Sequence, residues 1–185
     1  MAKQDRNAKT LLKEIGEIVL ALAIAWFVYQ GLGLLTGTNL PIVAVVSDSM
    51  YHGPNDRGGD LCGSPAGSPA DFDSFWSACG AFYDGKDITK DDFRAFPMRS
   101  GLSKGDLLFV TSKEPEVGDI VIYQRSSQSY TIVHRIVEKG DTIVAKGDNN
   151  AGPDQPITRQ EVEGTVAFAV PLLGYPRFAL FAFGV

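Results

Sequence analysis

The segment Thr131 to Asn150, TIVHRIVEKGDTIVAKGDNN, has the pattern of a β-hairpin. Two runs rich in Val, Ile and Thr flank the sequence Glu-Lys-Gly-Asp at 138–141, and Gly and Asp are typical turn residues. Pairing across this turn places His134 opposite residues 145–147. Asp148 follows directly, within the roughly 5 to 8 Å that separate neighbouring cross-strand side chains. The hairpin therefore predicts a histidine close to a carboxylate.

Short runs of similar composition predict further strands on both sides of this hairpin. With the two hairpin strands at 131–137 and 142–145, they lie at 42–46, 107–111, 120–123 and 165–170. Gly-Asp pairs punctuate the runs at 105–106, 118–119, 140–141 and 147–148. Glycine permits positive φ and aspartate bonds to nearby backbone amides, so each pair suits a turn. The pattern predicts a mainly β domain, either a barrel or a sandwich.

An apolar stretch near the N-terminus predicts a membrane helix. No Asp, Glu, Lys or Arg lies between Glu17 and Asp48, and residues 18–35 would form a helix of about 27 Å, close to the roughly 30 Å hydrocarbon core of a bilayer. A cleaved signal peptide would be shorter and end in small residues, so a permanent anchor is favoured. Basic residues at 3, 6, 9 and 13 precede the stretch and the next is Arg57, which predicts a cytoplasmic N-terminus.

Composition limits the classes of protein to which the chain can belong. The 185 residues are 44% hydrophobic and 21% charged, which suits one packed domain. The net charge of -5 argues against a broadly basic nucleic-acid binder. Two cysteines are too few for a disulfide framework, and they are too far apart for a Cys-x-x-Cys motif. The spacing of the two cysteines and two histidines does not match known zinc motifs. We therefore expect no metal, no cofactor and no nucleic acid.

Residues 52–100 have a different pattern, which predicts a partly helical insert. Helix starts are predicted at Ser68-Pro69-Ala70-Asp71 and at Thr89-Lys90-Asp91-Asp92. An apolar stripe follows the first start, formed by Phe72, Phe75, Trp76 and Cys79. The stripe favours a small internal core over a surface that docks on a membrane or partner. In an outer compartment Cys62 and Cys79 could form a disulfide, and the sequence leaves this open.

The candidate chemistry centres on His134. This residue lies in an apolar strand, where it is either a buried core histidine or a base with a carboxylate partner. A serine nucleophile needs a base to accept its proton, and a carboxylate fixes the tautomer of that base. Ser49, His134 and one of Asp148 and Asp154 would supply these three groups.

Four motifs in this order resemble the boxes of type I signal peptidases. They are Ser-Asp-Ser-Met at 47–50, Gly-Asp-Ile-Val-Ile at 118–122, Val-His-Arg-Ile at 133–136, and Lys-Gly-Asp-Asn-Asn at 146–150 with a later aspartate at 154. The chain resembles more narrowly the archaeal and endoplasmic-reticulum branch, which has histidine where the bacterial enzymes have a catalytic lysine. The resemblance covers nearly the whole chain outside the insert.

The resemblance implies a signal-peptidase-like β fold with one N-terminal transmembrane helix. We expect a cytoplasmic tail at 1–14, the membrane helix at 15–37, a catalytic β domain at 38–171 that contains the insert 52–100, and an apolar tail at 172–185, packed on the barrel or interfacial. The expected location is a membrane, with the catalytic domain outside. An archaeal membrane is favoured over the endoplasmic reticulum. Expected partners are secretory preproteins, membrane lipid and the protein-translocation machinery.

The implied reaction is removal of signal peptides from secreted preproteins through an acyl-serine intermediate. The resemblance makes Ser49 the nucleophile and His134 the general base, with Asp154 preferred to Asp148 as the essential carboxylate. Ser47 would help the backbone amide of Ser49 to hold the oxyanion. Met50 is expected beside a shallow substrate pocket.

The sequence also departs from the family pattern, and alternatives remain. Asp48 stands where the family usually has glycine, and the continuation of the serine box at 97–106 comes only after the insert. His52 is a rival base. Lys139 and Lys146 could serve a related serine peptidase with a lysine base. The last alternative is a non-enzymatic, membrane-anchored β module whose insert binds a partner.

Overall fold

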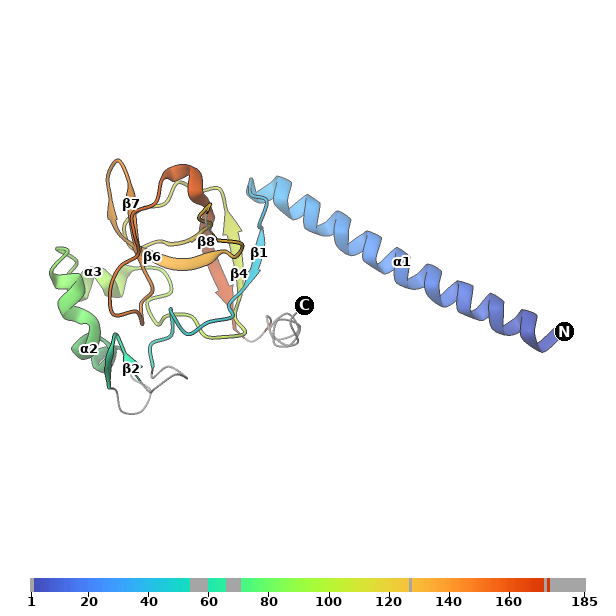
Figure 1. Ribbon diagram of the computed structural model, residues 1–185, viewed down its shortest axis with the longest axis horizontal. Helices are drawn as coiled ribbons and strands as arrows, with labels where there is room; N and C mark the ends of the chain where they lie inside the picture. The colour runs from blue at the N-terminus through green and yellow to red at the C-terminus, as the bar shows by residue number, and fades with distance from the viewer. Residues whose placement is uncertain (1, 54–59, 66–70, 127, 172, 174–185) are drawn as a thin grey trace.

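One six-stranded antiparallel sheet forms the centre of the protein in the computed structural model, which describes residues 2–53, 60–65, 71–126, 128–171 and 173 (Figure 1). The strands occur in the order β1-β4-β8-β5-β6-β7 across the sheet. Their bounds are Ile42–Ala44 (β1), Leu107–Thr111 (β4), Ile120–Tyr123 (β5), Ile132–Lys139 (β6), Ile143–Lys146 (β7) and Val162–Val170 (β8). The predicted mainly β fold is confirmed.

The central strands are buried because both of their faces carry apolar side chains. On β5, Ile120 and Ile122 pack in one core cluster with Leu108 of β4, whereas Val121 packs in a second cluster with Ile136 of β6. All five side chains are fully buried. Each such side chain contributes about 1.5 to 3 kcal/mol by leaving water, so β5 and β6 form a rigid base for residues at their ends.

The β6–β7 hairpin has the predicted register. Arg135 lies opposite Lys146 and Ile136 opposite Ala145, after which a bulge shifts the pairing by one residue. The turn closes with a hydrogen bond from the Gly140 amide to the Thr142 carbonyl. Continuing the register by one residue places His134 opposite Gly147, within the predicted window.

Helix α1, Ala2–Thr36, projects away from the β domain as a single long helix (Figure 1). Its segment 10–36 is 27 residues long, and the most apolar 18-residue window within it has a mean hydropathy of 2.1 and is not buried against the rest of the protein. Gly37, with φ of +69°, ends the helix and donates to the Gly33 carbonyl, as a left-handed cap does. The expected single N-terminal transmembrane helix is present, and it extends through most of the segment expected to be a tail.

The insert lies between β1 and β4, at the end of the β domain far from α1 (Figure 1). It contains β2 (Asp60–Leu61), β3 (Ser64–Pro65), α2 (Phe72–Asp84) and α3 (Lys90–Ala95). Thr89 and Asp92 form the predicted capping box of α3. The start of α2 is a correction, because its cap is Asp71, which accepts from the Ser74 amide. Residues 68–70 lie outside the described part of the chain.

The aromatic stripe of the insert forms a small core, as predicted. Phe75, Tyr83 and Phe93 are fully buried in a cluster that also includes Val137 of β6, so the insert packs on the hairpin. Cys62 and Cys79 form a disulfide within it, with their Cα atoms 5.6 Å apart. The expected apolar tail at 172–185 lies outside the described residues, apart from Leu173.

Candidate active site

A cavity of about 400 Å³ lies between the chain that leaves β1 and the start of β6. It is lined by residues 43–47, 49–50, 128, 130–134 and 154, and thus by Ser47, Ser49, His134 and Asp154. β1 is the terminal strand of the sheet, and β6 pairs with β7 only from Arg135 onward. The cavity therefore lies beside two strand edges that the sheet leaves unpaired.

His134 and Asp154 form a hydrogen-bonded pair in this cavity. Nδ1 of His134 donates to Oδ2 of Asp154 at 2.5 Å, and the Tyr123 hydroxyl donates to the same oxygen at 2.8 Å. Burial alone would raise the pKa of Asp154, but the hydrogen bond and charge of His134, with the bond from Tyr123, lower it. An ionised carboxylate only accepts, so in the neutral form of the His134 ring the proton lies on Nδ1 and the lone pair on Nε2.

Gly147 brings Ser49 and His134 together. A Cβ atom at this position would lie 2.7 Å from His134 Nε2 and 2.7 Å from the Ser49 carbonyl oxygen. Real Cβ contacts are never this short, so only glycine fits between the two residues. The close packing at Gly147 places Nε2 of His134 beside the turn that carries Ser49.

The turn that carries Ser49 is held by several polar contacts. The hydroxyls of Ser47 and Ser49 lie 3.2 Å apart, and the Ser49 carbonyl accepts from the Asn149 amide at 2.8 Å. Asp48, the departure from the family pattern, is paired with Lys104, whose Nζ donates to its carboxylate at 2.7 Å. The lysine charge thereby offsets the carboxylate next to Ser49.

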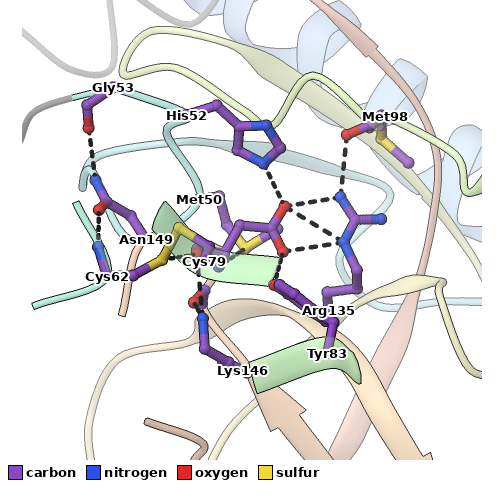
Figure 2. A network of polar contacts seen from close by, with 12 residues as sticks. Met50, His52, Gly53, Cys62, Cys79, Tyr83, Met98, Arg135, Lys146 and Asn149 are labelled. Carbon is purple, nitrogen blue, oxygen red and sulfur yellow. Dashed lines mark hydrogen bonds and ion pairs between the residues drawn. A yellow bond between two sulfur atoms is a disulfide. The ribbon is translucent and has the colours of Figure 1, made fainter. Parts of the chain in front are cut away.

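Asp148 lies outside this cavity, in a buried cluster beneath the insert, and Figure 2 shows the side chains of its partners Arg135, His52 and Tyr83. Its carboxylate accepts from Nη2 of Arg135 at 2.8 Å, from Nε2 of His52 at 2.9 Å and from the Tyr83 hydroxyl at 3.1 Å. Burial alone would raise the pKa of Asp148, but Arg135 and His52 hold it well below its usual range. Of the two predicted carboxylates, Asp154 contacts His134 and Asp148 does not.

The alternative bases also lie away from the cavity. The ring of His52 stacks on Phe75 at 3.6 Å, inside the insert interface. Lys139 pairs with Glu116 at the surface. Nζ of Lys146 is buried, which lowers its pKa to about 8, and donates to two backbone carbonyls on its own loop. None of the three lines the cavity of Ser49.

The sequence analysis assigned no role to three residues that hold the site together: Tyr123, Lys104 and Asn149. Tyr123 directly follows the Gly-Asp-Ile-Val-Ile motif on a predicted strand, and this position could have indicated that it lies near His134. Met50, expected beside a substrate pocket, lines the cavity and is 1% exposed. In the part of the chain that the structure describes, no three His, Cys, Asp or Glu side chains converge to hold a metal ion.

The fold and this site together define a class of protein: a β domain on a membrane helix, with a serine pair and a histidine–aspartate pair in one cavity. Curated relatives extend this description. The chain is 27% identical to the signal peptidase complex catalytic subunit SEC11 of Verticillium alfalfae over 96% of this chain and 84% of the relative. The SEC11 protein of Fusarium vanettenii is 26% identical over 94% of this chain and 83% of its own length.

A shorter match has higher identity. The Colletotrichum graminicola SEC11 protein is 34% identical over 100 residues, which cover 45% of this chain and 58% of that relative. No protein-family profile matches the chain. The similarity to these catalytic subunits over nearly the whole chain confirms the resemblance to type I signal peptidases of the endoplasmic-reticulum branch. These three relatives are fungal, and the archaeal source stays a prediction.

Proposed function

We propose that this protein is a membrane-anchored serine endopeptidase that removes signal peptides from secreted preproteins. The observation that carries the proposal is the His134–Asp154 pair, whose free Nε2 lies beside the Ser49 turn in one cavity. The similarity to catalytic subunits of the signal peptidase complex supports the same reaction.

In the proposed reaction Ser49 Oγ attacks the scissile carbonyl carbon while its proton passes to Nε2 of His134. Asp154 stabilises the imidazolium that forms. The C–N bond then breaks, and the imidazolium gives its proton to the departing amine. A water molecule, deprotonated by the same nitrogen, hydrolyses the acyl-serine and regenerates Ser49.

The negative oxygen formed during attack needs hydrogen-bond donors. We assign this role to the Ser47 hydroxyl, which lies 3.2 Å from Ser49 Oγ, and to the backbone amide of Ser49. One such donor contributes about 3 kcal/mol to transition-state stabilisation. The pairing of Asp48 with Lys104 supports this assignment, because it limits the negative charge next to the forming oxyanion.

The substrate segment would bind as an extended strand between the unpaired edge of β1 and the start of β6. Apolar side chains around the cavity, among them Ala44, Met50 and Val133, suit the small side chains near a signal-peptide cleavage point. In this arrangement α1 anchors the enzyme in the membrane and the basic N-terminal residues keep that end in the cytoplasm, with the site outside. The relatives' names as complex subunits support the participation of further subunits.

The test is cleavage of a reporter preprotein by the full chain in membranes. We expect Ser49→Ala and His134→Ala each to abolish processing, and Ser49→Ala to abolish labelling by a serine-directed acylating probe. Ser77→Ala, which removes an exposed hydroxyl on α2, serves as the matched control and should cleave normally. Substantial processing by either of the first two variants would refute the assignment.

A further inference from the structure

The turn that carries Ser49 runs directly into the insert. Ser49 is separated from Gly53 by a short loop, and the described insert then packs its core against Val137 of β6. None of the described insert residues lines the cavity. The described part of the insert is therefore placed to act on Ser49 through the turn.

Asn149 joins the turn to the insert. Its backbone amide donates to the Ser49 carbonyl at 2.8 Å, and Nδ2 donates to the carbonyls of Gly53 at 2.9 Å and Asp48 at 3.3 Å. Oδ1 accepts from the Cys62 amide at 3.1 Å (Figure 2). At 5% exposure, this one side chain holds both ends of the Ser49 turn and the turn between β2 and β3 of the insert.

The neighbouring residue, Asp148, fixes the insert to the same loop. Its carboxylate accepts from His52, whose ring stacks on Phe75 of α2. Sγ of Cys62 lies 3.1 Å from the Asp148 carbonyl oxygen, and the disulfide continues to Cys79 of α2. The disulfide thus connects the contact point at Asn149 to the helical body of the insert.

The side chains of the proposed catalytic pair have different hydrogen-bond partners. His134 is oriented by Asp154 and Tyr123, neither of which contacts the insert by a hydrogen bond, whereas the Ser49 turn is held by Asn149. A nucleophile must lie about 2.6 to 3.2 Å from its base, and a misplacement of about 1 Å can cost about 100-fold in rate. We expect loosening of the insert to displace Ser49 more than His134, because Asp154 and Tyr123 continue to orient the His134 ring.

We propose that the disulfide-closed insert is a positioning element for the nucleophile: Cys62 and Gly53 orient Asn149, and Asn149 holds Ser49 against His134. This inference rests on the proposed function, because it takes Ser49 as the nucleophile. Asn149 and Cys62 are positioning residues, which touch no substrate.

The test measures kcat and KM of the full-length purified protein on a reporter preprotein. Asn149→Asp keeps the size of the side chain but replaces both Nδ2 donors by an acceptor that faces two carbonyls. We expect kcat to fall by about 30-fold or more while KM changes less than about 3-fold. The double variant Cys62→Ser with Cys79→Ser keeps the Cys62 amide but opens the disulfide, and we expect kcat to fall by about 5-fold with KM unchanged.

Lys86→Ala provides the matched control, because it breaks an exposed ion pair between the insert and Glu138 without contacting Asn149. Its kcat should equal that of the wild type. A folded Asn149→Asp protein with wild-type kcat would overturn the inference. If Asn149→Asp does not fold, the test rests on the double variant Cys62→Ser with Cys79→Ser. An unchanged kcat in that folded variant would overturn the inference.

Ser49→Ala in the same series separates the two proposals. Retained cleavage by Ser49→Ala refutes the proposed function itself. Loss of cleavage by Ser49→Ala, together with wild-type kcat in both positioning variants, refutes only the role of the insert.

Discussion

The two histidines of this protein each pair with an aspartate of the loop that follows β7, yet the two pairs have different surroundings. His134 bonds to Asp154 through Nδ1, at the edge of a cavity that also contains Ser49. His52 bonds to Asp148 through Nε2, beneath Phe75 and away from that cavity. Each carboxylate also accepts from a tyrosine hydroxyl, Tyr123 in one pair and Tyr83 in the other.

The comparison teaches that a histidine–carboxylate pair does not by itself indicate catalysis. The charge of Asp148 is matched by the Arg135 guanidinium, and both side chains are fully buried, so this pair holds the insert on the sheet. Asp154 has the His134 ring and the Tyr123 hydroxyl as its side-chain hydrogen-bond donors, so in the proposed reaction its charge can stabilise an imidazolium. Access to the cavity that contains Ser49 distinguishes the two pairs.

Replacing the histidines gives the largest expected difference. His134→Ala should lower kcat by at least about 1,000-fold, because the nucleophile loses its base. His52→Phe keeps a ring stacked on Phe75 and should lower kcat by less than about 10-fold. Cleavage of the reporter preprotein by both variants measures the contrast. Equal losses would mean that the two pairs are not functionally distinct.

Replacing the aspartates should separate activity from stability. Asp154→Asn should lower kcat by about 100- to 10,000-fold with little change in the free energy of unfolding, because the His134 tautomer is no longer fixed. Asp148→Asn should lower the free energy of unfolding by about 3 to 5 kcal/mol, because Arg135 is left buried without a counter-charge. Thermal unfolding in detergent, with kcat on the folded fraction, measures both.

The acid dependence of stability provides a second measurement on the same variants. The pKa of Asp148 is lower in the folded protein than in the unfolded chain, so its stabilising contribution is complete above about pH 4 and decreases as the pH falls toward the folded pKa. The melting temperature of the wild type should therefore decrease as the pH is lowered below about 4. A curve for Asp148→Asn as steep as that of the wild type would contradict this role.

The tyrosines give the smallest expected difference. Tyr123→Phe removes a donor from Asp154, so the pKa of that carboxyl should rise and the acid limb of the kcat profile should move to higher pH. We expect kcat near neutral pH to fall by about 3- to 10-fold. Tyr83→Phe, which removes the matching hydroxyl from Asp148, should leave the shape of the profile unchanged. A shifted profile in both variants would argue against a specific effect on Asp154.

Much of the fold could be predicted from local sequence. The strands at 107–111 and 120–123 have the predicted bounds, and the β6–β7 register lies close to the predicted one. Alternation of apolar residues, turn chemistry at Gly-Asp pairs and a long apolar stretch are properties of neighbouring residues, so no tertiary contact is needed to interpret them. The cap of α2 was wrongly predicted because Ser68 and Asp71 both suit a cap, and local sequence does not choose between them.

The sequence by itself determined the anchor, the sheet and a short set of candidate groups: Ser49, His134 and two aspartates. Only the tertiary structure decided that Asp154 bonds to His134, that His52 and Asp148 hold the insert, and that Cys62 and Cys79 meet. The physical reason is that Asp148 and Asp154 share one loop, and either could reach a strand neighbour by spacing alone. Burial of Arg135 beneath the insert draws Asp148 to one side of the sheet and leaves Asp154 on the side of the cavity.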